Sequence, residues 1–407
     1  MTEFHPTRLG LIASILQSNV DKKSKPEEPA VELCNYTDVY YNDTITADLD
    51  FMKATASPDQ VERLRLAGGD VIITKDSETA DDIGIPAYVE STHDSLVCGY
   101  HLTILRPRSE KVFPKFLYYS MLSRGTGEYW EKRANGVTRV SIPQQTVSSL
   151  TIPLPDLETQ RRIADFLDNE ISEMDAMIEE FDGLATNLRN RRSLLISKRL
   201  YAHLEDCERD VVGLWHYAIT NPLTPEFKEL PEGENVDFLP LENVWAHGRA
   251  DYSKQIAWDG GKSSYTQFRR GDILVPKVTP TVFHGRTMIA ETESSIGLAT
   301  SEVHTLRAHP NADPRWIVYN MLSSNFLDDA RGQIYGVAGL QRISTQYLST
   351  FKVPLTPLKK QREIADELDR EFERMDALIE ESTQLIENLK ARKTALITEV
   401  VTGRKEV

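Results

Sequence analysis

The feature that most constrains the fold of this chain is a long internal repeat. The segment 160–200 recurs as 361–401, and about half of the aligned positions are identical. Both copies begin with Gln-Arg, continue with Ile-Ala-Asp, and carry Met-Asp-Ala and Ile-Glu-Glu at the same spacing. Agreement over such a length is far above chance, so the sequence predicts two copies of one structural unit.

The similarity extends more weakly upstream of both copies. Gly69–Ile73 resembles Gly271–Val275, and one residue after each run stands a lysine, Lys75 or Lys277. The chain is therefore predicted to consist of two half-chains of about 200 residues. In each half, a weakly similar domain precedes a strongly similar segment.

Within the strongly similar segments, apolar residues recur at alternating spacings of four and three. This sustained seven-residue pattern, flanked by charged residues, is typical of a coiled-coil seam. The predicted seam residues are Leu167, Ile171, Met174, Ile178, Phe181, Leu188, Leu195, Leu368, Phe372, Met375, Ile379, Ile386, Leu389 and Leu396. The alternative is that each helix packs inside a globular domain, but so narrow a stripe favours pairing of the two helices. Arg192 and Lys393 share one repeated seam position, where each would either extend to solvent or set the register.

The segments ahead of the helices lack long helical periodicity and contain short β-rich runs separated by glycine turns. We predict mixed α/β domains, each with one helix at Pro114–Ser123 or Pro314–Ser323, because proline is favoured at the first helical position. The fold class is therefore α+β with a pseudo-twofold internal repeat. The predicted boundaries are 1–152 and 201–353 for the two domains, and 153–200 and 354–407 for the helical segments.

Composition narrows the functional classes. The 407 residues include 47 basic and 62 acidic side chains, for a net charge of −15. This balance argues against nucleic-acid binding unless local basic clusters or a partner supply positive charge. The apolar run near the start is too short to cross a membrane, and no secretory signal is recognised. Cys34, Cys98 and Cys207 lie far apart, which favours free thiols in a reducing cytoplasm.

Motifs for chemistry are missing from the sequence. Asn221-Pro222 lacks the second proline and the aromatic residue of a DNA methyltransferase tetrad, and Gly261-Lys262-Ser263 lacks the earlier glycine of a phosphate loop. The nine histidines are scattered, without the spacing of a zinc site. No catalytic or metal-ligating residue and no cofactor is therefore predicted for this chain.

Local basic clusters are the candidates for DNA contact, because Arg and Lys read guanine edges and bind phosphates, while Gln reads adenine. Basic residues of the first domain collect near the glycine loop 135–138, whose counterpart in the second half is 336–342, and the densest positive run is Lys262, Arg269, Arg270, Lys277 and Arg286. The candidate DNA-binding residues are Lys75, Arg133, Arg139, Lys262, Arg269, Arg270, Lys277, Arg286, Gln341 and Arg342. For any one of them, an ordinary solvated position is an equally good reading.

The chain resembles a known family, the specificity (S) subunits of type I restriction-modification systems. The resemblance rests on Ile-Pro-Leu-Pro at 152–155 and Glu-Thr-Gln-Arg-Arg-Ile-Ala at 158–164, followed by a long helix. The whole unit is then repeated, and the second copy ends with Val-Thr-Gly at 401–403. The resemblance covers essentially the full chain.

This resemblance implies that each domain reads one half of a split double-stranded DNA site. The two long helices would form an antiparallel coiled coil that spaces the domains and docks two methyltransferase subunits. S-adenosylmethionine and any restriction or motor subunit would belong to partner chains. Half-sites read from one side of B-DNA tend to lie whole turns apart, so the helices would act as a ruler. The rival reading is a tandem-domain scaffold that does not bind DNA; an enzyme has no motif in its support.

Overall fold

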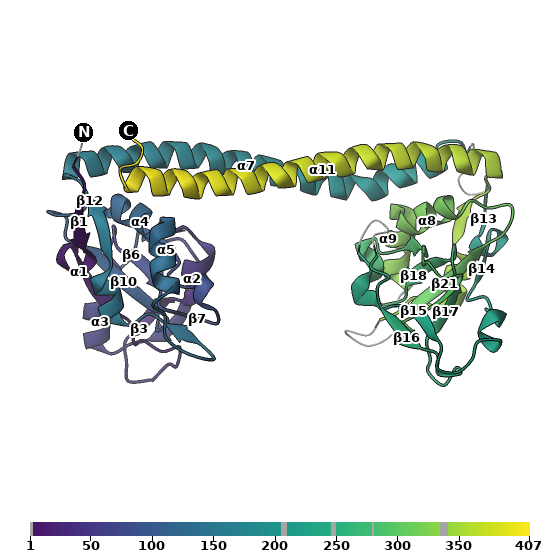
Figure 1. Cartoon of the computed structure of the whole chain (residues 1–407), viewed down its shortest axis with the longest axis horizontal. Coiled ribbons are helices and arrows are strands. Elements are labelled where there is room, and N and C mark those ends of the chain that lie inside the picture. The colour runs from purple at the N-terminus through teal and green to yellow at the C-terminus, as the bar shows by residue number, and fades with distance from the viewer. Residues whose placement is uncertain (1–2, 205–209, 246–249, 279–280, 334–340) are drawn as a thin grey trace. The chain divides into compact units, whose positions relative to one another are not determined.

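The computed structural model describes residues 3–204, 210–245, 250–278, 281–333 and 341–407. The chain divides into two compact units: unit 1 comprises Met1–Asp182 and Thr383–Val407, and unit 2 comprises Gly183–Ser382. The boundary falls inside both long helices, α7 (Leu157–Tyr201) and α11 (Leu358–Val401). Each unit therefore holds one α/β module and one half of each long helix (Figure 1).

The first module (residues 5–154) is an α/β domain in unit 1. Its strands are β1 (His5–Arg8), β2 (Ala13–Gln17), β3 (Ala30–Cys34), β4 (Thr44–Ile45), β5 (Met52–Thr55), β6 (Val71–Thr74), β7 (Asp76–Ser77), β8 (Pro86–Val89), β9 (Leu96–Cys98), β10 (Leu102–Pro107), β11 (Val140–Ser141) and β12 (Thr151–Leu154). Its α-helices are α1 (Leu9–Ile12), α2 (Tyr36–Tyr41), α3 (Pro58–Leu64), α4 (Pro114–Leu122), α5 (Arg124–Glu131) and α6 (Gln144–Ser149).

The second module (residues 211–354) lies in unit 2. Its strands are β13 (Val211–Gly213), β14 (Ala218–Thr220), β15 (Asn235–Leu239), β16 (Gln255–Ala257), β17 (Thr266–Arg269), β18 (Ile273–Pro276), β19 (Met288–Ile289), β20 (Ile296–Ala299), β21 (Val303–Ala308) and β22 (Lys352–Pro354). Its α-helices are α8 (Pro314–Leu322), α9 (Ser324–Gln333) and α10 (Thr345–Thr350). The predicted helices beginning at Pro114 and Pro314 are confirmed as α4 and α8.

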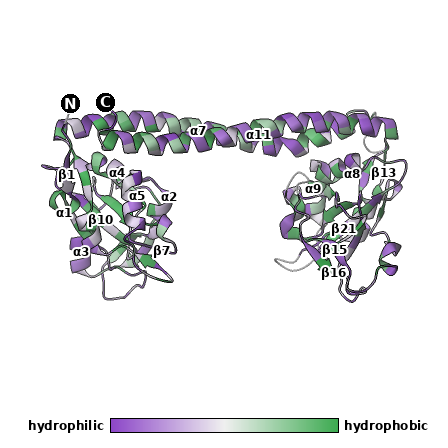
Figure 2. Ribbon diagram, viewed as in Figure 1, coloured by the Kyte–Doolittle hydropathy of each residue, from purple (hydrophilic) through white to green (hydrophobic). Residues whose placement is uncertain are grey.

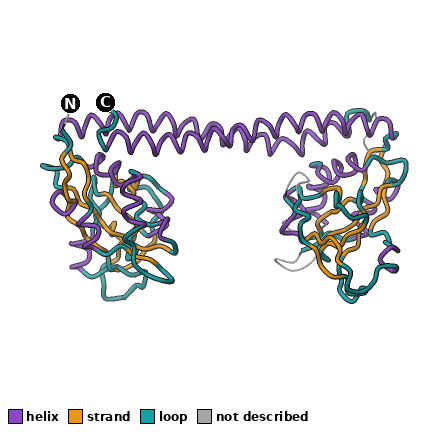
Figure 3. The backbone as a smooth tube through the Cα atoms, viewed as in Figure 1, coloured by secondary structure: helices purple, strands orange, loops and turns teal. Residues whose placement is uncertain are grey.

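The two modules share the central part of their sheet topology and differ in their edge strands. The sheet nearer the helices runs β2-β10-β6-β8-β4 in the first module and β14-β21-β18-β19 in the second. The other sheet runs β5-β3-β9 in the first and β16-β15-β20-β17 in the second, and its β3 or β15 pairs antiparallel on one side and parallel on the other. The strand that opens each module, β1 or β13, pairs with the strand that closes it, β12 or β22. The predicted α+β class with an internal repeat is confirmed; Figure 3 shows the mixture of strands and helices in each module.

In each unit a hydrophobic core joins the module to the long helices. In unit 1, Phe116 of α4 packs in one cluster with Leu167 of α7 and Val400 of α11. In unit 2, the corresponding cluster contains Trp316 of α8 and Leu368 of α11. Hydrophobic and hydrophilic residues alternate along both long helices (Figure 2), as burial of one face requires.

The predicted seam positions are all buried or half-buried. At the outer ends of the helix pair, further residues such as Ile163, Ile364 and Val401 are buried as well. They are buried because the helices there cover the modules as well as each other. The narrow seam thus describes the contact between the two helices. At the ends, the helices also pack into the domain cores, as the alternative interpretation predicted.

The charged seam positions are paired with acids. In unit 1, Lys393 Nζ lies 2.9 Å from Asp175 on the other helix. In unit 2, Arg192 pairs with Asp376 and is almost fully buried, with its guanidinium 4.9 Å from the centre of the Phe372 ring. Both contacts join α7 to α11 running antiparallel, and they lie at equivalent repeat positions. These contacts favour the interpretation that Arg192 and Lys393 set the register of the helix pair rather than extend to solvent.

A glutamine at the start of each long helix holds its module by three hydrogen bonds. Gln160 Oε1 accepts from Phe113 N (2.7 Å), while its Nε2 donates to Pro155 O (2.8 Å) and to Lys111 O (3.3 Å). Gln361 makes the same set: its Oε1 accepts from the backbone N–H ahead of α8 (2.9 Å), and its Nε2 donates to two carbonyls (2.7 and 3.2 Å). Both side chains are almost completely buried. The repeated glutamine is therefore a structural clamp.

The predicted free thiols are found where the structure describes them. Cys34 and Cys98 are free and buried, and burial raises the pKa of both thiols. Cys207 lies outside the described residues.

Candidate nucleic-acid interface

Each module places one of the predicted lysines at the end of a central strand. Lys75 follows β6, and Lys277 follows β18. The carbonyl of each accepts a hydrogen bond from a later segment, from Ile142 N (2.8 Å) and Ile343 N (3.0 Å) respectively. Two residues far apart in the sequence therefore occupy equivalent places, as the upstream similarity predicted.

The two lysine side chains are anchored in the same way. Lys75 Nζ donates to Ser18 O and Lys277 Nζ donates to Ser301 O, each at 2.7 Å. Both ammonium groups are half-buried, and the loss of water around them lowers their pKa from the usual value. Lys75 Nζ also lies 4.3 Å from the centre of the Tyr100 ring.

An arginine paired with an acid stands beside each lysine. In the first module, Arg139 lies 3.1 Å from Asp76, whose carboxylate also bonds His101 Nδ1 at 2.8 Å. In the second module, Arg342 donates from Nε and a terminal nitrogen to the two oxygens of Glu302, at 2.8 Å each. These bonds lower the pKa of Glu302. We call each lysine–arginine pair a basic edge: Lys75 with Arg139 in the first module, and Lys277 with Arg342 in the second.

Gln341 directly precedes Arg342 and is half-buried, so it belongs to the same part of the second module. Arg133 follows α5, and its guanidinium lies 4.1 Å from the centre of the Tyr129 ring. It precedes Asn135, which forms a β-bridge with Ser141. Three predicted residues of the first module, Lys75, Arg133 and Arg139, thus come from segments that are linked in the fold.

The remaining predicted residues of the second module do not join this group. Arg269 and Arg270 precede β18, whereas Lys277 follows it, so the length of a strand separates them. Arg269 pairs with Glu226 at 2.7 Å, and Lys262 pairs with Glu232. Arg286 donates to a backbone carbonyl elsewhere. The basic residues that lie close together in the sequence between Lys262 and Arg286 are therefore spread over several parts of the module.

The glycine loop of the first module forms a tight turn. Gly136 has φ of 145°, and a Cβ there would meet Arg139 O at 1.9 Å, so only glycine fits. Val137 at the tip is fully exposed. Of the counterpart segment 336–342, residues 336–340 lie outside the described residues.

Sequence reasoning missed a buried ion pair that each module repeats. Arg106 donates to both oxygens of Asp70 (2.8 and 2.7 Å), and Arg307 donates to both oxygens of Asp272 at the same distances. Both aspartates are almost fully buried. The signal was present as a Gly-Asp pair in the two similar runs, where the glycine has φ of 90° in both copies. These arginines hold strands together, which separates them from the candidates for ligand contact.

The described residues lack two kinds of feature. No group of three or more His, Cys, Asp or Glu side chains there is arranged to hold a metal ion. No described helix combines the length and the apolar character needed to cross a membrane.

Comparison with known proteins agrees with the resemblance. A family model for the type I restriction modification DNA specificity domain matches residues 7–180. The putative type I restriction enzyme MjaX specificity subunit of Methanocaldococcus jannaschii is 26% identical over 372 residues, which cover 86% of this chain and 81% of that protein. The EcoAI specificity subunit of Escherichia coli is 26% identical over 145 residues, covering 35% of this chain and 25% of that protein.

Solved structures share the fold. A chain from a structure of type I R-M complex assembly and conformational transition aligns with a TM-score of 0.75 at 17% identity, covering 99% of this chain and 98% of that one. The HsdS subunit of Thermoanaerobacter tengcongensis aligns with a TM-score of 0.55 at 18% identity, covering 99% and 97%. With two repeated modules on paired helices, a matching domain model over residues 7–180 and a relative similar over most of its length, the chain is similar in sequence and in fold to type I restriction-modification specificity subunits.

Proposed function

We propose that this chain recognises a two-part DNA sequence for a type I restriction-modification complex, with each module reading one part. The observation that supports this most is the basic edge, which both modules build at equivalent positions. Arginine and lysine at such an edge can contact guanine edges and phosphates. Around the basic edges the two modules carry different residues, as two readers of different sequences require.

The long helices are proposed to dock methyltransferase subunits. Five large apolar side chains on the described long helices are exposed: Met177 and Leu385 in unit 1, and Leu184, Leu194 and Leu378 in unit 2. Met177 corresponds to Leu378 in the repeat, and Leu184 corresponds to Leu385. Each unit therefore offers one equivalent pair of exposed apolar side chains on its helices, which supports two equivalent partners, whereas Leu194 has a smaller counterpart, Ala395. Methyl transfer from S-adenosylmethionine, and cleavage by a restriction subunit where one exists, would take place in those partners.

Charge makes the partners necessary for tight binding. The chain carries a net charge of −15, and acids hold the arginine of each basic edge. Long-range attraction to DNA must then come from a partner. We therefore expect the isolated chain to bind DNA weakly.

The test is to express this chain with its cognate methyltransferase subunit and to sequence the host DNA for methylated bases. The expected result is one bipartite motif that disappears when the gene for this chain is deleted. Gel-shift titration with and without the methyltransferase should show much tighter specific binding for the complex. Methylation without a bipartite motif, or no DNA binding by the complex, would support the scaffold alternative instead.

A length change tests the ruler hypothesis. One heptad would be inserted into α7 between Glu180 and Leu188 and one at the repeat-equivalent place in α11, so that the seam stays in phase. Seven residues lengthen a helix by about 10 Å, or roughly 3 bp of B-DNA. The gap in the methylated motif should lengthen accordingly. An unchanged gap would contradict the ruler role.

A further inference from the structure

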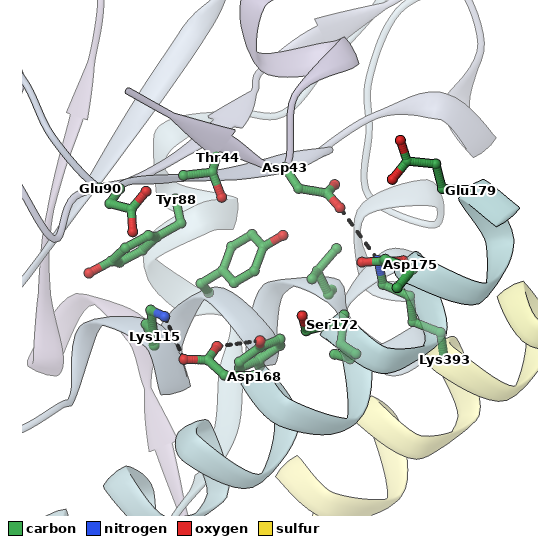
Figure 4. A pocket seen from close by; sticks show the side chains of 15 residues that line it. Asp43, Thr44, Tyr88, Glu90, Lys115, Asp168, Ser172, Asp175, Glu179 and Lys393 are labelled. Atoms are coloured by element: carbon green, nitrogen blue, oxygen red, sulfur yellow. Dashed lines mark hydrogen bonds and ion pairs between the residues drawn. The ribbon is translucent and has the colours of Figure 1, made fainter. Parts of the chain in front are cut away.

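A cavity of about 450 Å³ lies between the first module and the long helices of unit 1. Its walls come from the segment around Asp43, from β8, from α4 and from one face of α7, with Lys393 of α11 at one end (Figure 4). All of these segments belong to unit 1. None of its lining residues belongs to the basic edge of the first module, so the cavity is a separate feature.

Carboxylates stand at both ends of this cavity. At one end, Asp168 accepts hydrogen bonds from Lys115 (2.5 Å) and Tyr119 (2.6 Å). At the other end, Lys393 Nζ lies 2.9 Å from Asp175 and 3.5 Å from Asp43. Seven helical residues separate Asp168 from Asp175, which corresponds to about 10 Å. Figure 4 shows the two groups at different places along α7.

Two further carboxylates are still available. Glu90 and Glu179 line the cavity and are exposed, and neither side chain has a hydrogen bond or ion pair within the described residues. The lining thus holds five carboxylates and two lysines. This excess of negative charge favours a cationic occupant.

The middle of the cavity is aromatic and apolar. Leu122, Ile171 and Tyr118 line it, and Tyr118 is only 8% exposed. The Tyr118 hydroxyl makes no hydrogen bond to any described residue. Burial, together with the carboxylates of Asp43 and Asp168, raises its pKa. It therefore stays protonated and unpaired, with a lone pair free to accept a bond from an N–H donor. A hydroxyl without a partner on a side chain that is more than nine-tenths buried points to a ligand or solvent group at this place.

We propose that this cavity binds a linear polyamine. Its terminal ammonium groups would meet the carboxylates at the two ends, and its methylene chain would lie along Leu122 and Ile171. The ring faces of Tyr88 and Tyr118 add cation–π attraction for an ammonium group. A polyamine fits better than a metal ion, because no described cluster of carboxylates is arranged to hold one. The proposal does not depend on the DNA-recognition function.

The repeat explains why unit 1 has this space. At positions equivalent to Ile171 and Ser172, unit 2 has Phe372 and Glu373, which are larger. Val318 replaces Tyr118, so the unpaired hydroxyl has no counterpart. The residues of unit 2 are therefore suitable substitutions for testing the cavity of unit 1, because the equivalent positions of unit 2 already accommodate them.

The test is isothermal titration of the full-length chain with spermidine at constant ionic strength. We expect one saturable site per chain. Glu179→Gln should weaken binding about five- to tenfold, because it removes a charged acceptor that has no other partner. The matched control is Glu380→Gln, the same change at the repeat-equivalent exposed position of unit 2, and it should leave the affinity unchanged.

Two more variants separate the cavity from general charge. Ile171→Phe fills the middle with the residue found at position 372 and should abolish the site, while Tyr118→Phe removes only the hydroxyl and should weaken binding about threefold. Circular dichroism checks that each variant folds; if Ile171→Phe does not, Glu179→Gln and Tyr118→Phe still decide the matter. Non-saturable binding, an equal loss in Glu380→Gln, or displacement of spermidine by Mg²⁺ at equal ionic strength would overturn the proposal.

Discussion

The two units of this chain agree where a module meets the helices and differ farther away. Gln160 and Gln361 make the same three hydrogen bonds, and Asp168 and Asp369 each bond a tyrosine and a basic residue from the helix that packs against them. Farther out, the second sheet has strands β5-β3-β9 in the first module and β16-β15-β20-β17 in the second. The seating of a module on the helices tolerates little change, whereas the outer strands are free to vary with the ligand.

The largest effect should come from breaking the buried ion pair in either module. Arg106→Leu removes the positive charge that pairs with the buried Asp70 carboxylate, and Arg307→Leu does the same to Asp272, so that backbone N–H groups are the remaining partners. Each should cost about 3–5 kcal/mol of unfolding free energy, measured in urea. The control Arg65→Leu removes an exposed pair and should cost under about 1 kcal/mol. A small loss in only one of the two modules would show that the pairs are not equivalent.

The next effect distinguishes the modules by pH. Burial lowers the pKa of His304 to about 4, with a smaller contribution from the charge of Lys277 and against the opposing hydrogen bond to Ile343 O. Between pH 6.5 and 4, the unfolded chain therefore binds a proton that the folded chain does not. Unit 2 should lose stability as the pH falls through this range, by up to about 3 kcal/mol.

The first module has Thr103 at the position of His304, on the equivalent strand. The variant His304→Thr should therefore remove most of the pH dependence of unfolding, measured at pH 7 and pH 5. If the pH dependence of unfolding were undiminished in this variant, other titratable groups of unit 2 would have to cause it.

A third effect concerns DNA reading and should be specific to one half of the target. Arg139→Ala should reduce methylation through the half-site read by the first module, and Arg342→Ala through the other half-site. A base contact of this kind discriminates by about 1–3 kcal/mol, or roughly 10- to 100-fold in rate. Methylation assays on substrates altered in one half-site measure this. Equal effects on both half-sites from one variant would contradict the division of labour.

The smallest effect is expected at the charged seam position. Lys393→Arg introduces the residue that stands at the equivalent position of unit 2, and Asp175 remains available as its partner. Unfolding free energy should change by less than about 0.5 kcal/mol. A charge reversal at the same place, Lys393→Glu, is the contrasting variant, because it sets two acids against each other.

The sequence was enough to predict the repeat, the long helices and their seam, since a seven-residue apolar pattern depends only on local spacing. It was also enough to place a helix at Pro114. It could not show which basic residues would gather, because that depends on strand ends: Lys277 and Arg270 lie on either side of β18. Nor could it show that acids would pair with Arg139 and Arg342, since those acids come from other segments.

The role of the repeated glutamine was hidden for a similar reason. Gln160 opens the most strongly repeated segment, yet its partners are backbone groups, which carry no signature in the sequence. Asp70 was visible as part of a repeated Gly-Asp, but the arginine that binds it lies 36 residues away. Contacts of this kind follow from the tertiary fold.

The reciprocal pairs between the long helices have an evolutionary consequence. Each helix supplies the acid in one unit and the base in the other: Asp175 with Lys393, and Asp376 with Arg192. A polypeptide of half this length would therefore carry a self-complementary helix. Two identical copies of it would form both contacts by dyad symmetry, so a symmetric homodimer that later became a single gene by duplication and fusion is a sufficient ancestor for this architecture.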